Sequence, residues 1–101
     1  MSILHTVNKS PFERNALAGC LRVAQEDGAI LLIEDGVYGA LKGTEHTKMV
    51  QDAMKKIHVY ALWPDVEARG MQDRVIEGIK QIDYAGFVEL TTQHKSIQSW
   101  L

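Results

Sequence analysis

The residue with the most reactive side chain in this sequence is Cys20, the only cysteine among 101 residues. Its thiolate could act as a nucleophile. Cys20 lies on an apolar stripe with helical spacing, where a cysteine usually packs as a small hydrophobic residue. The stripe consists of Ala16, Leu17, Cys20, Leu21, Val23 and Ala24. Spacing alone therefore favours a buried thiol, and a single cysteine excludes an internal disulfide.

Two adjacent carboxylates, Glu34 and Asp35, end an apolar run and precede Gly36. Carboxylates at the end of a parallel strand could hold Mg²⁺. The pair resembles the magnesium site of phospho-acceptor receiver domains, in which later strands add another carboxylate and a lysine. Here, however, the pair follows the second predicted strand and not the first, and the chain is too short to supply the full set. We therefore expect turn formation and capping here, and no bound metal.

The remaining candidates for metal or hydrolytic chemistry are scattered. No two histidines have the spacing of zinc ligands; they are His5, His46, His58 and His94. The sequence has no Gly-x-Ser-x-Gly elbow and no glycine-rich loop for a dinucleotide or phosphate. It therefore gives no basis for a zinc site or a serine hydrolase, and we expect no cofactor.

Alternating strands and helices must position these residues. The run 29–33 shows no alternation of polar and apolar residues, so it predicts a central strand buried on both faces of a parallel sheet. Further strands are predicted at 3–7, 57–62 and 81–83, and helices at 11–26, 37–41, 44–56, 65–69 and 84–93. A single domain, 1–101, with this order is typical of a small α/β fold. We expect a flavodoxin-like or Rossmann-like three-layer sandwich with a mostly parallel sheet.

Two short segments give information about the start of the first predicted helix and about the C-terminal end of the chain. Ser10, Pro11 and Glu13 predict the start of the first helix, with the serine as its cap and the proline in the first helical position. The chain ends in Ser99-Trp100-Leu101, an apolar tip that we expect to dock on the protein itself or on a partner.

Composition limits the partners. The formal net charge is −2, from 11 Lys and Arg against 13 Asp and Glu, which disfavours direct binding to nucleic acid. No apolar run approaches the roughly 20 residues that span a bilayer. The first residues show no secretory signal, so we expect a cytoplasmic protein without membrane contact, in which Cys20 stays reduced.

Several blocks together resemble one family, the DsrH/TusB sulfur-relay subunits. The blocks are Leu4-His5-Thr6 with Ser10-Pro11; Leu31-Leu32 with Asp35-Gly36-Val37; Val59-Tyr60-Ala61-Leu62 with Asp65 and Ala68-Arg69-Gly70; and Ile82-Asp83-Tyr84 with Phe87-Val88, Leu90-Thr91 and Trp100. The match runs almost from end to end. Cys20 and the ending Gln98-Ser99-Trp100-Leu101 look like the DsrH branch.

The resemblance implies the DsrE/DsrF-like α/β fold and a place in a heterohexamer with DsrE-like and DsrF-like subunits. It also implies transfer of persulfide sulfur to a DsrC/TusE-like carrier protein during intracellular sulfur oxidation, with Cys20 as a candidate persulfide carrier. Two alternatives stay open. The chain could be a TusB-type subunit for 2-thiolation of the tRNA wobble uridine, or a structural docking subunit without chemistry of its own.

Overall fold

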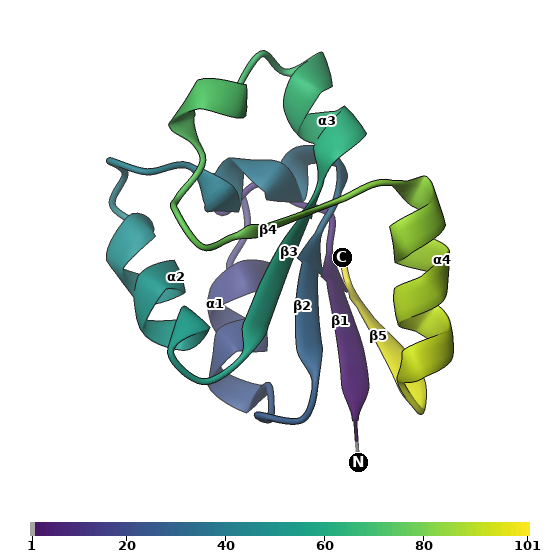
Figure 1. Ribbon diagram of the computed structural model, residues 1–101. Coiled ribbons are helices and arrows are strands. Elements are labelled where there is room, and N and C mark those ends of the chain that lie inside the picture. Colours follow the sequence, from purple (N-terminus) through teal and green to yellow (C-terminus); the bar gives the residue numbers. More distant parts are fainter. Residues whose placement is uncertain (1) are drawn as a thin grey trace.

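The computed structural model describes residues 2–101, and a five-stranded parallel sheet forms their centre (Figure 1). The order across the sheet is β4-β3-β2-β1-β5, and each neighbouring pair is parallel. The four residues of β2 are all buried, as a central strand requires. The predicted α/β class with a parallel sheet is confirmed. The strands are β1 (Ile3–Val7), β2 (Ala29–Leu32), β3 (His58–Leu62), β4 (Lys80–Ile82) and β5 (Ser96–Trp100).

Helices flank the sheet unequally. Helices α1 and α2 lie on one side and α4 on the other (Figure 1). Side chains alternate across a strand, so the sheet divides the core in two. The larger cluster includes Cys20, Ile30 and Leu32, and the smaller one includes Leu4 and Leu31. The helices are α1 (Ala16–Val23), α2 (Thr47–Met54), α3 (Trp63–Ala68) and α4 (Tyr84–Gln93), with 3₁₀ helices η1 (Glu34–Ala40) and η2 (Gln72–Arg74).

The first helix is shorter than the predicted range 11–26. The N–H groups of Glu13 and Arg14 both donate to the Ser10 carbonyl at 3.0 Å, which closes a separate turn. The Ser10 hydroxyl accepts the Phe12 N–H at 3.2 Å, so it caps this turn. Helix α1 itself starts after Asn15, whose side chain makes no capping bond, and it ends where Ala24 becomes extended. The sequence pattern did not distinguish a turn followed by a helix from one continuous helix.

The segment between β2 and β3 also differs from expectation. The short helix predicted at 37–41 is η1, which begins earlier, at Glu34, with only Ile33 between it and β2. Helix α2 starts later than the predicted residue 44, because the Thr47 hydroxyl accepts the Thr44 N–H at 2.9 Å and holds residues 44–46 in a turn. Side-chain bonding of this kind competes with helix formation.

Three elements between residues 58 and 93 follow the prediction closely. Strands β3 and β4 each lie within one residue of their predicted bounds, and α4 has the predicted bounds. The side chain of Asp83 caps α4 by accepting the Gly86 N–H at 2.8 Å. Helix α3 starts two residues early, at Trp63, because Pro64 suits its first turn.

The C-terminal tail forms β5, a strand that the sequence did not predict. It pairs with β1 over the whole of both strands, from Ile3 opposite Ser96 to Val7 opposite Trp100. The Trp100 indole Nε1 donates to His5 Nδ1 at 3.0 Å. Its ring also packs on α1, where a Cβ on Gly19 would lie 3.3 Å from it. The apolar tip therefore docks on the protein itself, which is one of the two outcomes we expected.

Replacing Trp100 tests whether its side chain anchors the last strand. Trp100→Ala should lower the free energy of unfolding by about 2 kcal/mol, because it removes a partly buried ring and the partner of a buried histidine. Urea unfolding of the isolated chain measures the change. The matched control is Leu101→Ala, since Leu101 is 79% exposed and should change stability by less than about 0.5 kcal/mol. Equal stabilities for the two variants would contradict the proposed anchor.

Candidate functional site

Cys20 lies on the inner side of α1 and is fully buried in the larger core cluster. Burial in these apolar surroundings raises the pKa of the Cys20 thiol from 9.0 to about 12, because an apolar environment disfavours the thiolate. Nucleophilic attack and persulfide exchange both require that thiolate. In the folded chain Cys20 is therefore a protonated packing group, as its spacing in the sequence favoured. Its role as a persulfide carrier stays a prediction.

The carboxyl edge of the sheet, where parallel α/β proteins usually bind ligands, holds a connected polar network. Arg69, at the end of α3, donates from Nε at 3.2 Å and from Nη2 at 2.8 Å to one carboxylate oxygen of Asp35. Its Nη1 donates to the Asp65 carbonyl at 3.1 Å. The hydrogen bond with Asp35 raises the pKa of Arg69 above its ordinary value. The network joins the end of β2 to α3.

Backbone geometry at the end of β2 depends on the same network. The Asp65 carboxylate accepts the Glu34 N–H at 2.6 Å, and Glu34 has a φ of 50°. This left-handed conformation is uncommon outside glycine, so neighbouring bonds must hold it. Two residues later, a Cβ on Gly36 would overlap the Val7 carbonyl, so only glycine fits. The carboxylates of Asp35 and Asp65 thus fix the turn with which η1 begins, as expected. The expected capping by the Glu34-Asp35 pair is wrong, because the residue at the N-cap of η1 makes no capping bond with its side chain.

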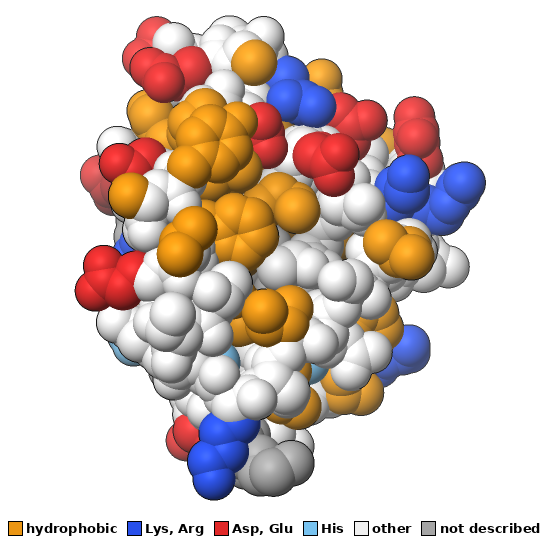
Figure 2. All heavy atoms as spheres, turned by 90° about the vertical axis from the view of Figure 1, so that its right-hand side faces the viewer, with side chains coloured by type: hydrophobic (Ala, Val, Ile, Leu, Met, Phe, Trp, Pro, Cys, Tyr) orange, Lys and Arg blue, Asp and Glu red, His pale blue; other side chains and the backbone are white. Residues whose placement is uncertain are grey.

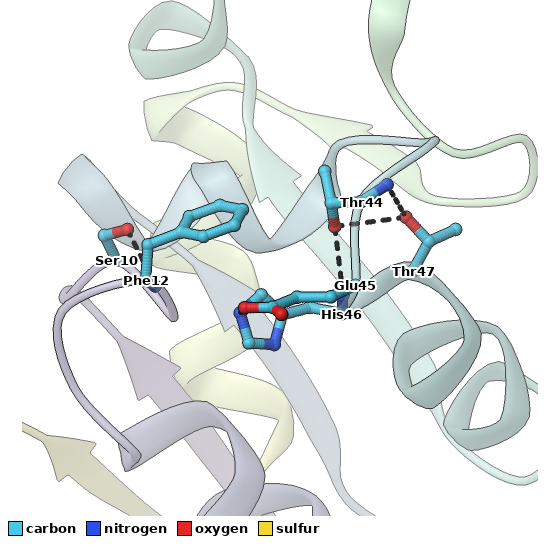
Figure 3. Close-up of polar contacts among 6 residues, drawn as sticks. All are labelled: Ser10, Phe12, Thr44, Glu45, His46 and Thr47. Atoms are coloured by element: carbon cyan, nitrogen blue, oxygen red, sulfur yellow. Dashed lines mark hydrogen bonds and ion pairs between the residues drawn. The ribbon is translucent and has the colours of Figure 1, made fainter.

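A second contact joins the loop after β1 to the loop before α2 (Figure 3). The rings of Phe12 and His46 meet edge to face with centroids 4.8 Å apart. The Thr44 hydroxyl accepts the His46 N–H at 3.1 Å, and His46 Nε2 lies 3.4 Å from the Glu45 carboxylate. The bonds among these residues are local, so the contact packs two loops together.

The other histidines occupy separate elements. His5 is buried in β1, and burial lowers its pKa. His58 is exposed at the start of β3, and His94 Nδ1 lies 2.8 Å from the Leu90 carbonyl at the end of α4. Among residues 2–101, no three His, Cys, Asp or Glu side chains group closely enough to hold a metal ion.

The structure brings together sequence blocks that lie far apart in the chain. Asp35 follows β2, and Asp65 and Arg69 follow β3, yet the three form one network. His5 and Trp100, from the first and last blocks, share a hydrogen bond. Reasoning from residue types missed both contacts, although all five residues belong to the blocks that carry the family resemblance. These blocks therefore position elements of the fold, and neither contact reaches Cys20 directly.

Comparison with known proteins identifies the family. The family model described as "DsrH like protein" matches residues 9–97. Proteins named "Protein TusB" from Escherichia coli O81 (strain ED1a) and Shigella flexneri are 39% and 38% identical to this chain over 98 residues, which covers 97% of the chain and 100% of each relative. The chain belongs to the DsrH-like family. The resemblance read from the sequence is thus confirmed, and with it membership of a family of sulfur-relay subunits.

Solved structures support the same fold for this DsrH-like chain. The crystal structure of the ychN protein from E. coli superposes with a TM-score of 0.85 at 16% identity, covering 98% of both chains. The MTH1491 protein from Methanobacterium thermoautotrophicum gives a TM-score of 0.71 at 17% identity over 96% of this chain and 97% of its own. At such low identity these neighbours establish the fold alone. Within residues 2–101, none of the helices has both the length and the apolar composition that a membrane span requires.

Burial of Cys20 predicts a specific alkaline instability. The raised pKa means that the unfolded chain releases the thiol proton near pH 9, whereas the folded chain keeps it until about pH 12. The stability of the wild type should therefore be independent of this group below pH 9 and fall as the pH rises between these values. By pH 10 the wild type should lose about 1 kcal/mol relative to Cys20→Ala, beyond their difference at pH 7.

Urea unfolding of both proteins at several pH values measures the effect. Because lysines and tyrosines titrate equally in both, the difference between the two curves isolates the thiol. A difference that stays constant from pH 7 to pH 10 would mean that the folded protein exposes Cys20 to solvent.

Proposed function

We propose that this chain is the docking subunit of a cytoplasmic sulfur-relay complex and carries no persulfide itself. The observation that supports this most is the complete burial of Cys20, with a thiol pKa raised to about 12. A group that exchanges sulfur must meet a partner's sulfur atom directly. In the alternative, Cys20 carries persulfide, which requires α1 to move away from the sheet and expose the larger core cluster.

The partners follow from the family. DsrE-like and DsrF-like subunits would complete a heterohexamer, and a DsrC/TusE-like protein would take the sulfur as a persulfide. The persulfide-carrying cysteine would belong to the DsrE-like subunit. The present chain would then contribute surface and stability to the assembly.

The sulfur could have either of two final acceptors. The relatives named TusB favour a complex that supplies 2-thiolation of the tRNA wobble uridine. Cys20 and the ending Gln98-Ser99-Trp100-Leu101 favour the branch that serves intracellular sulfur oxidation. We place the chain in the first branch, because the similarity to the TusB proteins covers almost its whole length.

Loading the assembled complex with sulfur tests the docking role. After incubation with a persulfide donor, intact-mass spectrometry should show one added sulfur, about 32 Da and removable by a thiol, on the DsrE-like subunit and none on this chain. Cys20→Ala should leave sulfur transfer to the carrier unchanged. Alanine is the appropriate replacement because serine would bury a hydroxyl.

The control is a complex whose DsrE-like subunit lacks its own cysteine, which excludes relay from that subunit. An adduct on Cys20 in that complex, together with loss of transfer in Cys20→Ala, would establish this chain as a carrier and refute the docking role.

The choice of acceptor is tested in cells. Deleting the gene for this chain should abolish 2-thiouridine in tRNA, measured by mass spectrometry of digested nucleosides, and the gene for Cys20→Ala should restore it. Normal 2-thiouridine in the deletion strain, combined with failure to oxidise stored sulfur, would assign the chain to the sulfur-oxidation branch.

A further inference from the structure

The side of the sheet that faces α4 is incompletely covered. Among the described helices α4 alone packs there, although parallel sheets bury both faces. Four hydrophobic residues of this cluster therefore stay partly exposed, and two others on α4 are 60% and 63% exposed. Together they form what we call the α4 patch, consisting of Ile33, Tyr60, Ile82, Tyr84, Phe87 and Val88.

The residues of the α4 patch lie close together. Tyr84, Phe87 and Val88 are spaced three and four residues apart, so they share one side of α4. Ile82 packs against the same helix, where a Cβ on Gly86 would overlap its side chain. Figure 2 shows hydrophobic side chains gathered on the upper half of this side of the molecule, with carboxylates beside them. A contiguous exposed apolar area bordered by polar groups is typical of a protein interface.

The border of the patch is mainly acidic. Glu34 adjoins Ile33, and Asp83 lies between Ile82 and Tyr84. Asp65 contributes a third carboxylate through its bond to the Glu34 N–H.

Basic groups at this border are fewer. Lys80 pairs in register with Tyr60 on the neighbouring strand and so shares its side of the sheet. Arg69 is already neutralised by Asp35. The surroundings of the patch thus carry net negative charge.

We infer that the α4 patch is the interface for a different subunit of the complex, whose own apolar surface is bordered by lysine and arginine side chains. The acidic border favours a different subunit over a second copy of this chain, because two copies would each bring net negative charge to a shared interface. Like charges brought together weaken association, whereas a basic border strengthens it and accelerates encounter. The inference rests on the proposed function, since it assumes that such a subunit exists.

The test uses co-expression of this chain with the DsrE-like and DsrF-like subunits. Val88→Arg places a positive charge in the patch, and arginine suits an exposed helical position. We expect at least about tenfold weaker assembly, measured by co-purification and titration of the purified subunits. Tyr84→Arg should behave in the same way. The matched control is Val23→Arg, because Val23 is 53% exposed on α1, on the other side of the sheet, and should assemble like the wild type.

Two further measurements examine the border and the choice of partner. Raising the salt concentration should weaken assembly of the wild type, because the charged borders attract each other. The isolated wild-type chain should not form a dimer through this patch. An isolated dimer that Val88→Arg breaks would overturn the inference in favour of a second copy, and assembly that does not respond to salt would overturn the basic border.

The outcomes also separate this inference from the proposed function. If the wild type and both patch variants assemble equally, with thermal melts showing all chains folded, the inference is wrong and the docking role survives. If the wild type does not assemble with either subunit, the proposed function fails and the inference fails with it.

Discussion

Burial of β2 on both faces is the constraint on which the rest of the structure depends. A strand made only of Ala29, Ile30, Leu31 and Leu32 has no side that tolerates water, so apolar layers must cover it on both sides. Parallel pairing with β1 and β3 requires long crossover connections, and the helices of those connections, α1 and α2, cover one side. Helix α4, from the connection between β4 and β5, covers the other side. The cluster of buried residues on the side of α1 and α2 is much the larger of the two.

The same covering determines the chemistry available to the chain. Cys20 lies on the face of α1 that packs against the sheet, so the residue type best suited to carry sulfur is removed from solvent. The desolvation that makes it a good packing group also raises its pKa, which suppresses the thiolate. Stability of the sheet and exposure of this thiol are therefore opposed in the folded chain, which is consistent with a subunit that contributes surface to a relay.

The shape of the carboxyl edge of the sheet is held by carboxylates, which in other parallel α/β proteins bind ligands at this edge. Asp35 is bonded to Arg69, and Asp65 is bonded to the backbone of Glu34. The left-handed φ of Glu34 and the close approach of Gly36 to Val7 fit this use, because a defined turn follows the central strand. Polar groups at this edge thus link β2 to α3.

The sequence by itself determined the α/β class, the central strand, the bounds of α4 and the DsrH-like family, because periodicity and local motifs depend on residues close together in the chain. Only the tertiary structure decided that the C-terminal tail forms a strand beside β1. Ser96, Gln98 and Ser99 carry no strand pattern, and β5 forms because β1 offers an open edge and Trp100 finds His5 and α1. The bond of Asp65 to Glu34 likewise joins residues 31 positions apart. Such contacts arise from the folding of distant segments onto one another, and no local pattern encodes them.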